Sequence, residues 1–178
     1  MREWISGRNP VYEVLRSANR QAFKLIIAQG SKEKGRLAEI IRLGKERKIP
    51  YEYCERSQLD NLNRTHQGVV LEASQYVYSD LKEILEQARK RSEEHFVLIL
   101  DTLQDPQNLG TLLRTAEACG IHGVILPKRK TATVTPAVVS ASSGASEYLH
   151  ITQMNLAQAI RILKANDVWV IEQKNLFR

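Results

Sequence analysis

The stretch from Phe96 to Gly120 restricts the possible folds of this chain more than any other part of the sequence. It begins with the apolar run Phe96–Leu100, which has the length of a strand buried on both faces. A polar turn with Asp105-Pro106 follows, and a proline there prevents continuation of the strand or an earlier helix. Apolar residues then recur at helical spacing over Leu109–Ala116, and Gly120 stands at the expected helix end. The pattern predicts a strand, loop and helix with polar residues at the carboxyl end of the strand, where open α/β sheets bind ligands.

The rest of the chain also alternates between strand and helix patterns. The first helix is predicted to begin at Pro10 with Asn9 as its N-cap, and Ser57–Asp60 resembles a capping box. Residues 1–75 are predicted to form a small α/β sandwich, residues 76–94 a linker, and residues 95–178 the start of a parallel sheet. The predicted strands are 24–28, 51–54, 69–73, 96–100, 123–126 and 168–171, and the other predicted helices centre on residues 37–41, 81–88, 136–145 and 156–163.

Composition limits the class of protein. A hydrophobic content of 43% is typical of a globular chain, and no apolar run reaches membrane-spanning length. The N-terminal residues contain no signal-peptide core, so we expect a cytoplasmic protein. Cys54 and Cys119 lack metal-type spacing, and we expect both to be small buried hydrophobes.

The positive charge is concentrated in the first part of the chain. Residues 1–75 contain 14 Lys and Arg against 9 Asp and Glu, whereas residues 76–178 contain 12 against 11. Clustered cations favour a polyanionic partner, because they neutralise phosphates and release counterions. A solvated basic surface explains the same excess equally well at this point.

Several common sites are excluded by their missing motifs. The chain has no glycine-rich dinucleotide loop, no phosphate-binding Gly-Lys-Ser/Thr loop, no Gly-x-Ser-x-Gly elbow and no histidine pair at zinc spacing, so no metal is expected. His95, His122 and His150 are interpreted as ordinary surface or core-edge residues. His66 differs because it lies in the polar loop 63–68, which also contains Arg64.

Asn108 and Arg114 are the candidate site residues on the helix after Pro106. They lie six positions apart and project from its first two turns. The alternative is that Asp105 or Asn108 caps the helix and that Arg114 is a surface arginine with a packed stem. Asp105, Asn108 and Gly110 all gather in one loop, which helix capping alone does not require. The residues by themselves still leave both interpretations open.

The motif Asp105-Pro-x-Asn108-Leu-Gly110-x-x-x-Arg114-Thr-Ala-Glu117-x-x-Gly120 resembles the first signature of the SpoU/TrmH family of RNA ribose 2′-O-methyltransferases in the SPOUT superfamily. Ser142–Ala145 resembles the Ser-Ala-Gly-Ala turn that follows it in the family. Gly7–Val11 and His66–Val69 resemble the RNA-binding domain of members acting on ribosomal RNA, including 23S-type RNA. That domain has a ribosomal-protein-like α/β/α fold.

The resemblance implies methyl transfer from S-adenosylmethionine to a ribose 2′-hydroxyl. It makes Arg114 the family's essential arginine, with Asn108 holding either that arginine or the ribose. Guanidinium groups stay protonated far above neutral pH, so we favour Arg114 as a cation that orients or stabilises the developing oxyanion rather than as a base. Glu117, three residues along the helix, is a candidate partner for Arg114 or simply a surface residue.

The resemblance also points to RNA contacts in the first domain. Arg8, Asn9, His66 and Gln67 are the candidates for hydrogen bonding or stacking with ribosomal RNA. Their alternative roles are helix capping for Asn9 and turn formation for His66-Gln67.

The chain departs from the family pattern at its end. Family members continue into a trefoil-knotted segment that forms most of the donor pocket and of the homodimer contact, whereas Glu172–Arg178 is unlike it. We therefore expect an N-terminal portion with an incomplete catalytic domain, little of the cofactor site and no assured dimer. The competing interpretations are a non-catalytic RNA-binding fragment and an α/β scaffold for protein partners.

Overall fold

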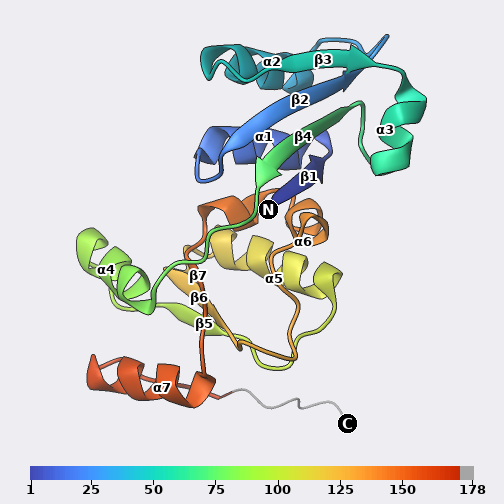
Figure 1. Cartoon of the computed structure of the whole chain (residues 1–178). Coiled ribbons are helices and arrows are strands. Elements are labelled where there is room, and N and C mark those ends of the chain that lie inside the picture. Colours follow the sequence, from blue (N-terminus) through green and yellow to red (C-terminus); the bar gives the residue numbers. More distant parts are fainter. Residues whose placement is uncertain (173–178) are drawn as a thin grey trace.

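The computed structural model describes residues 1–172, which form two sheets with helices between and around them (Figure 1). The first sheet has the order β1-β4-β2-β3, in which β2 and β3 are parallel and β4 runs antiparallel to both β1 and β2. Its strands are β1 (Arg2–Ser6), β2 (Ala22–Ala28), β3 (Tyr51–Cys54) and β4 (Val69–Ser74).

Helices cover both faces of the first sheet. Leu25 and Ile27 of β2 pack into the cluster of α1 (Arg8–Ser17) and α2 (Arg36–Glu46), while Ile26 packs on the opposite face with Leu59 of α3 (Arg56–Leu62). This alternation follows from the two-residue period of a strand. The predicted α/β/α arrangement is confirmed.

The second sheet is parallel, with the order β5-β6-β7. Val124 of the central strand faces α5 and α6, whereas Ile125 faces α4 and α7. Its elements are α4 (Leu81–Arg91), β5 (Val97–Ile99), α5 (Pro106–Ala118), β6 (Gly123–Leu126), α6 (Pro136–Ala141), the 3-10 turn η1 (Ala145–Tyr148), β7 (Ile151–Gln153) and α7 (Leu156–Ala165). Because α5 and α6 lie between the two sheets, the largest apolar cluster contains residues from both halves of the chain (Figure 1).

Several predicted helix starts and burial patterns differ from the structure. Helix α1 begins at Arg8 behind Gly7, and α3 begins behind Glu55, so the N-cap at Asn9 and the capping box at Ser57–Asp60 are wrong. Strand β5 is an edge strand and only half buried, because β6 takes the central position. Cys54 is partly buried as expected of a small hydrophobe, but Cys119 is exposed.

The strand predicted at 168–171 is also wrong. Within the described residues it pairs with no other strand, although Val168 and Val170 still pack near α7 while Trp169 and Ile171 are exposed. The third strand is instead β7, which is too short to give a clear pattern. The segment predicted as a linker contains α4, whose buried face packs on the second sheet. None of the helices in the described part has the length and apolarity needed to cross a bilayer.

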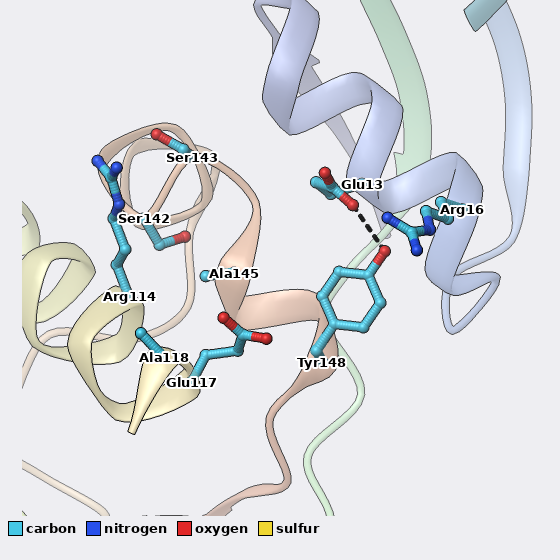
Figure 2. A pocket seen from close by; sticks show the side chains of 9 residues that line it. All are labelled: Glu13, Arg16, Arg114, Glu117, Ala118, Ser142, Ser143, Ala145 and Tyr148. Atoms are coloured by element: carbon cyan, nitrogen blue, oxygen red, sulfur yellow. Dashed lines mark hydrogen bonds between the residues drawn. The ribbon is translucent and has the colours of Figure 1, made fainter. Parts of the chain in front are cut away.

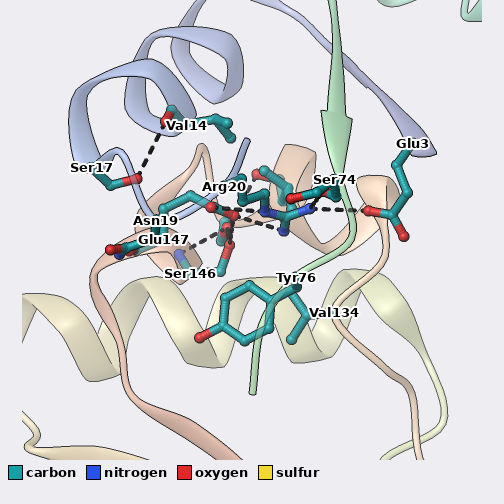
Figure 3. A network of polar contacts seen from close by, with 12 residues as sticks. Glu3, Val14, Ser17, Asn19, Arg20, Ser74, Tyr76, Val134, Ser146 and Glu147 are labelled. Atoms are coloured by element: carbon teal, nitrogen blue, oxygen red, sulfur yellow. Dashed lines mark hydrogen bonds and ion pairs between the residues drawn. The ribbon is translucent and has the colours of Figure 1, made fainter. Parts of the chain in front are cut away.

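A polar network joins the two halves (Figure 3). Arg20, which follows α1, donates from Nε and Nη2 to the Glu147 carboxylate of η1 at 2.9 Å each, and from Nη1 to Glu3 of β1 at 3.0 Å. Asn19 donates to the Glu147 carbonyl oxygen at 2.7 Å, and the Tyr76 hydroxyl donates to the Leu149 carbonyl oxygen at 2.6 Å. The halves therefore hold a fixed relative position.

Candidate functional site: a cleft between the two halves

Helix α5 starts with a well-formed cap. The Asp105 carboxylate accepts hydrogen bonds from the backbone N–H groups of Gln107 and Asn108, both at 3.2 Å, and Pro106 takes the first helical position. The capping interpretation of Asp105 is thus confirmed. The Asn108 side chain is exposed and makes no hydrogen bond within the described residues.

Gly110 allows α5 to approach α6 closely. A Cβ atom at this position would lie 2.4 Å from the Cβ of Ala141 and 2.9 Å from the backbone nitrogen of Ser142. Only a residue without a side chain fits at this distance. The glycine therefore sets the position of the Ser142–Ala145 turn beside α5.

A cleft of about 470 Å³, which we call the junction cleft, lies where α1 faces α5 and this turn (Figure 2). Arg114 stands on α5 next to Ser143, and Glu117 projects toward the side where Tyr148 lies. The lining residues are Glu13 and Arg16 of α1, Arg114, Glu117 and Ala118 of α5, and Ser142, Ser143, Ala145 and Tyr148.

Contacts across the junction cleft fix its walls. The Tyr148 hydroxyl donates a 2.6 Å hydrogen bond to Glu13. Partial burial raises the pKa of Tyr148, and the neighbouring Glu13 carboxylate raises it further. Gly144 has φ 88, and a Cβ there would lie 2.6 Å from the Cβ of Glu13. The turn can contact α1 this closely only because residue 144 is glycine.

The structure brings Arg114 and Glu117 into one cleft but does not pair them. Both side chains are exposed, and within residues 1–172 neither forms an ion pair. Of the two alternatives for Glu117, the exposed side chain without an ion pair fits the surface residue, and Asn108 makes no hydrogen bond to Arg114 within these residues. A contact of Asn108 with the ribose stays a prediction. Asn108 lies earlier on α5, outside the residues that line the junction cleft.

A second cleft, the basic cleft, lies on the first half of the chain. Its volume is about 660 Å³, and no carboxylate lines it. Arg8 and Gln67, both predicted RNA contacts, meet here: the Arg8 backbone N–H donates to Gln67 Oε1 at 3.0 Å, and Arg8 Nε donates to the Gln67 carbonyl oxygen at 3.2 Å. The lining residues are Arg8, Gly30, Ser31, Lys32, Lys34, Arg56 and Gln67. The sequence interpretation missed Lys32, Lys34 and Arg56, for which the charge excess of residues 1–75 was the available signal.

His66 supports the loop behind the basic cleft rather than facing solvent. Its ring is fully buried, with Nδ1 accepting from the Gly68 N–H at 2.8 Å and Nε2 lying 3.1 Å from Asp60 Oδ1. The first bond assigns the proton to Nε2, which then donates to Asp60. This geometry matches the turn-forming role. Asn9 is exposed on the first turn of α1, outside the basic cleft.

Neither cleft has the ligands of a metal centre, and no group of three His, Cys, Asp or Glu suited to a metal occurs in the part of the chain that the structure describes. The groups that remain available in the two clefts are cations, hydroxyls, amides and two carboxylates. Such a set suits recognition of a phosphate backbone more than hydrolysis by a metal or a nucleophile.

Two family models match the chain, and each covers one sheet. Residues 4–79 match the model for RNA 2′-O ribose methyltransferase substrate binding, and residues 95–175 match the SpoU rRNA Methylase family. Among curated relatives, YacO of Bacillus subtilis, named as a TrmH family tRNA/rRNA methyltransferase, is 37% identical over 95% of this chain and 68% of its own length. A protein of the same description from Staphylococcus aureus is 41% identical over 93% of this chain and 67% of its own.

Solved structures show the same fold. The SpoU methyltransferase AviRb from Streptomyces viridochromogenes, in complex with AdoMet, aligns with a TM-score of 0.70 at 18% identity over 93% of this chain and 59% of that one. An rRNA methyltransferase from Sinorhizobium meliloti aligns with a TM-score of 0.71 at 24% identity over 92% and 59%. The chain thus spans about three fifths of the length of these structures.

Proposed function

Because this chain belongs to the SpoU/TrmH family of RNA methyltransferases, we propose that it binds ribosomal RNA and serves in methyl transfer from S-adenosylmethionine to a ribose 2′-hydroxyl. In this proposal residues 1–75 are the RNA-binding domain, residues 76–94 connect it, and residues from 95 onward belong to the methyltransferase domain. The observation that carries the proposal is the junction cleft, where Arg114 of the first motif lies beside the Ser142–Ala145 turn.

The basic cleft supports the RNA-binding part of the proposal. Arg8, Lys32, Lys34 and Arg56 surround it with four cations and no carboxylate. Such a surface binds phosphates by neutralisation and counterion release, and Gln67 adds an amide that can form hydrogen bonds. In this proposal Arg8 and Gln67 contact RNA directly, Asn9 contacts it from the exposed first turn of α1, and His66 acts by shaping the loop.

Arg114 is the proposed catalytic residue. A ribose hydroxyl must lose its proton as it attacks an electrophilic methyl group, which S-adenosylmethionine supplies when bound. The free guanidinium of Arg114 can orient that hydroxyl and stabilise the developing alkoxide. Asn108 and Glu117 are proposed to position the ribose, from the first turn of α5 and from inside the junction cleft.

We assign none of the described residues to binding of the methyl donor. AviRb, a neighbour in fold, is described as bound to AdoMet. The junction cleft of this chain is lined by four charged side chains and Ala118 from α1 and α5, and by small residues and one tyrosine from the turn and η1. Small-molecule pockets are lined mainly by apolar and aromatic side chains, and this lining has only one tyrosine and two alanines of that kind, so it does not fit an adenine ring. The described residues therefore supply the RNA side of the proposed site.

A methylation assay tests the proposal. The chain is incubated with labelled S-adenosylmethionine and either ribosomal RNA or transfer RNA, and 2′-O-methylated nucleotides are identified by mass spectrometry after nuclease digestion. Because the described residues give the donor no site, we expect methylation of ribosomal RNA to depend on donor-binding residues outside them. We expect Arg114→Gln to lower the rate at least about a hundredfold, the usual cost of removing a group that stabilises an oxyanion.

Other outcomes separate the alternatives. RNA binding without any methyl transfer would favour a non-catalytic RNA-binding protein. The residues that line both clefts also allow that role, because they can bind RNA without a methyl donor. Methylation of transfer RNA alone would reject the ribosomal target. A chain that binds no RNA even at low salt would contradict both roles.

A further inference from the structure

We propose that Arg16, a residue of the RNA-binding half, binds a phosphate of the RNA in the junction cleft opposite Arg114, so that both halves hold the same nucleotide. This inference rests on the proposed function and extends it with a residue that the sequence motifs do not include. Arg16 lies in the last turn of α1 and Arg114 in the middle of α5, and the two side chains line one cleft.

Arg16 is free to bind a ligand. Its side chain is exposed and has no ion pair or hydrogen bond with any described residue. Arg20, four residues later, is by contrast buried and occupied by Glu3 and Glu147. Arg20 therefore has a structural role, whereas Arg16 and Arg114 are two unpaired guanidiniums on different walls of the junction cleft (Figure 2).

Glu13, the carboxylate of α1 that lines the junction cleft, is engaged by a residue other than Arg16. Glu13 accepts the hydrogen bond of the Tyr148 hydroxyl at 2.6 Å and makes no ion pair with Arg16. A tyrosine hydroxyl is protonated at neutral pH, so Tyr148 continues to donate this hydrogen bond to Glu13. Glu117 is the remaining carboxylate of the cleft, and it belongs to the α5 wall.

The position of Arg16 relative to Arg114 is fixed by the packing of α1. The Gly144 turn contacts the helix at Glu13, and the Arg20–Glu147 pair anchors its end to η1. The backbone positions of the two arginines are thereby set before a ligand binds, so that only their side chains lose conformational freedom on binding.

The chemistry of the cleft favours a phosphodiester. Guanidinium groups bind phosphate oxygens through two parallel hydrogen bonds, and Ser143 adds a hydroxyl beside Arg114 (Figure 2). The volume of about 470 Å³ lies in the range of small-ligand sites and can hold one nucleotide.

RNA affinity of the full chain at several salt concentrations tests this inference. We expect Arg16→Gln to weaken binding and to reduce the slope of log affinity against log salt by about 0.7 to 0.9, the change for one lost phosphate contact. Arg16→Lys should restore the slope. Arg42→Gln is the matched control, because Arg42 is an exposed helical arginine that pairs with Glu46 on α2, outside both clefts.

A double-mutant comparison shows whether Arg16 and Arg114 hold the same part of the RNA. The fold-loss of RNA affinity in the double variant Arg16→Gln/Arg114→Gln should be smaller than the product of the two single fold-losses. In Arg42→Gln/Arg114→Gln the fold-loss should equal that product. An Arg16→Gln chain with the affinity and slope of the Arg42→Gln control would overturn the inference, as would multiplicative losses for Arg16 and Arg114. Failure of the unmutated chain to bind RNA would instead reject the proposed function.

Discussion

The Arg20 guanidinium and the Glu147 carboxylate form a buried ion pair with two parallel hydrogen bonds of 2.9 Å, and it joins residues 127 positions apart. The exposed fractions of the two side chains are 1% and 0%. Burial raises the pKa of the Glu147 carboxyl, and the Arg20 guanidinium opposes that rise. This pair is a buried polar link between the two halves of the chain.

Glu147→Gln is expected to destabilise the protein by about 3 to 5 kcal/mol, because it leaves the Arg20 charge buried without its counter-ion. Urea unfolding monitored by circular dichroism measures this change. Glu46→Gln, at an exposed pair with Arg42, should cost no more than about 1 kcal/mol. Equal losses in the two variants would show that the buried pair contributes no more than a surface pair.

Gly110→Ala should destabilise the protein by about 1 to 3 kcal/mol, since the new methyl group would overlap Ala141 and the Ser142 backbone. Gly44→Ala is the matched control. In α2 the added Cβ would lie 3.5 Å from a Leu25 methyl group, an ordinary contact, and the higher helix propensity of alanine should stabilise by up to about 1 kcal/mol. We therefore expect Gly110→Ala to lower the thermal unfolding midpoint and Gly44→Ala to raise it. A midpoint that rises in both variants would contradict the close packing at Gly110.

His66→Ala should destabilise the protein by about 1 to 3 kcal/mol, because the buried Gly68 N–H loses its acceptor. The loop that presents Gln67 to Arg8 should loosen as well, and RNA affinity should fall with stability. His66→Asn keeps an acceptor that can reach the N–H two residues on, so it should retain part of both properties. Unchanged stability in His66→Ala, measured by urea unfolding, would argue against the supporting role.

Tyr53 should titrate near pH 12, because its hydroxyl donates a 2.6 Å hydrogen bond to Glu33 and this bond raises its pKa to about 12. The bond stabilises the folded state while the phenol is protonated, and this contribution is lost as pH rises from about 10, the ordinary value, through 12. The ring-carbon NMR shift of Tyr53 follows the titration. Glu33→Gln should bring the midpoint back toward 10, whereas Glu39→Gln on α2 should leave it unchanged.

Most of the fold could be predicted from local patterns, and the exceptions have physical causes. Strand β3 and the helix over Leu81–Arg91 follow from apolar spacing and turn residues. Strand β7 has only three residues, and the extended segment at 168–171 has a strand pattern without a pairing partner in residues 1–172. Strand pairing depends on neighbours distant in sequence, which a local pattern does not reveal.

The candidate site could be predicted only where it follows from one continuous motif. Arg114 and Glu117 belong to one motif and line the same cleft, the junction cleft. Arg8 and Gln67 belong to two motifs 59 positions apart, and only the tertiary fold brings them together in the basic cleft. Arg16 and Tyr148 enter the junction cleft from segments more than 130 residues apart, so their proximity is a property of the tertiary fold. The burial of His66 also depends on the tertiary fold and could not be predicted from the sequence.

The polar network between the two halves also sets the distance from the basic cleft to Arg114, so the protein can measure a length along its RNA. Under the proposed function, target choice then depends on the length of an RNA element as well as on its bases. Lengthening the stem of a substrate hairpin one base pair at a time should move methylation to a different ribose, or abolish it, at each step.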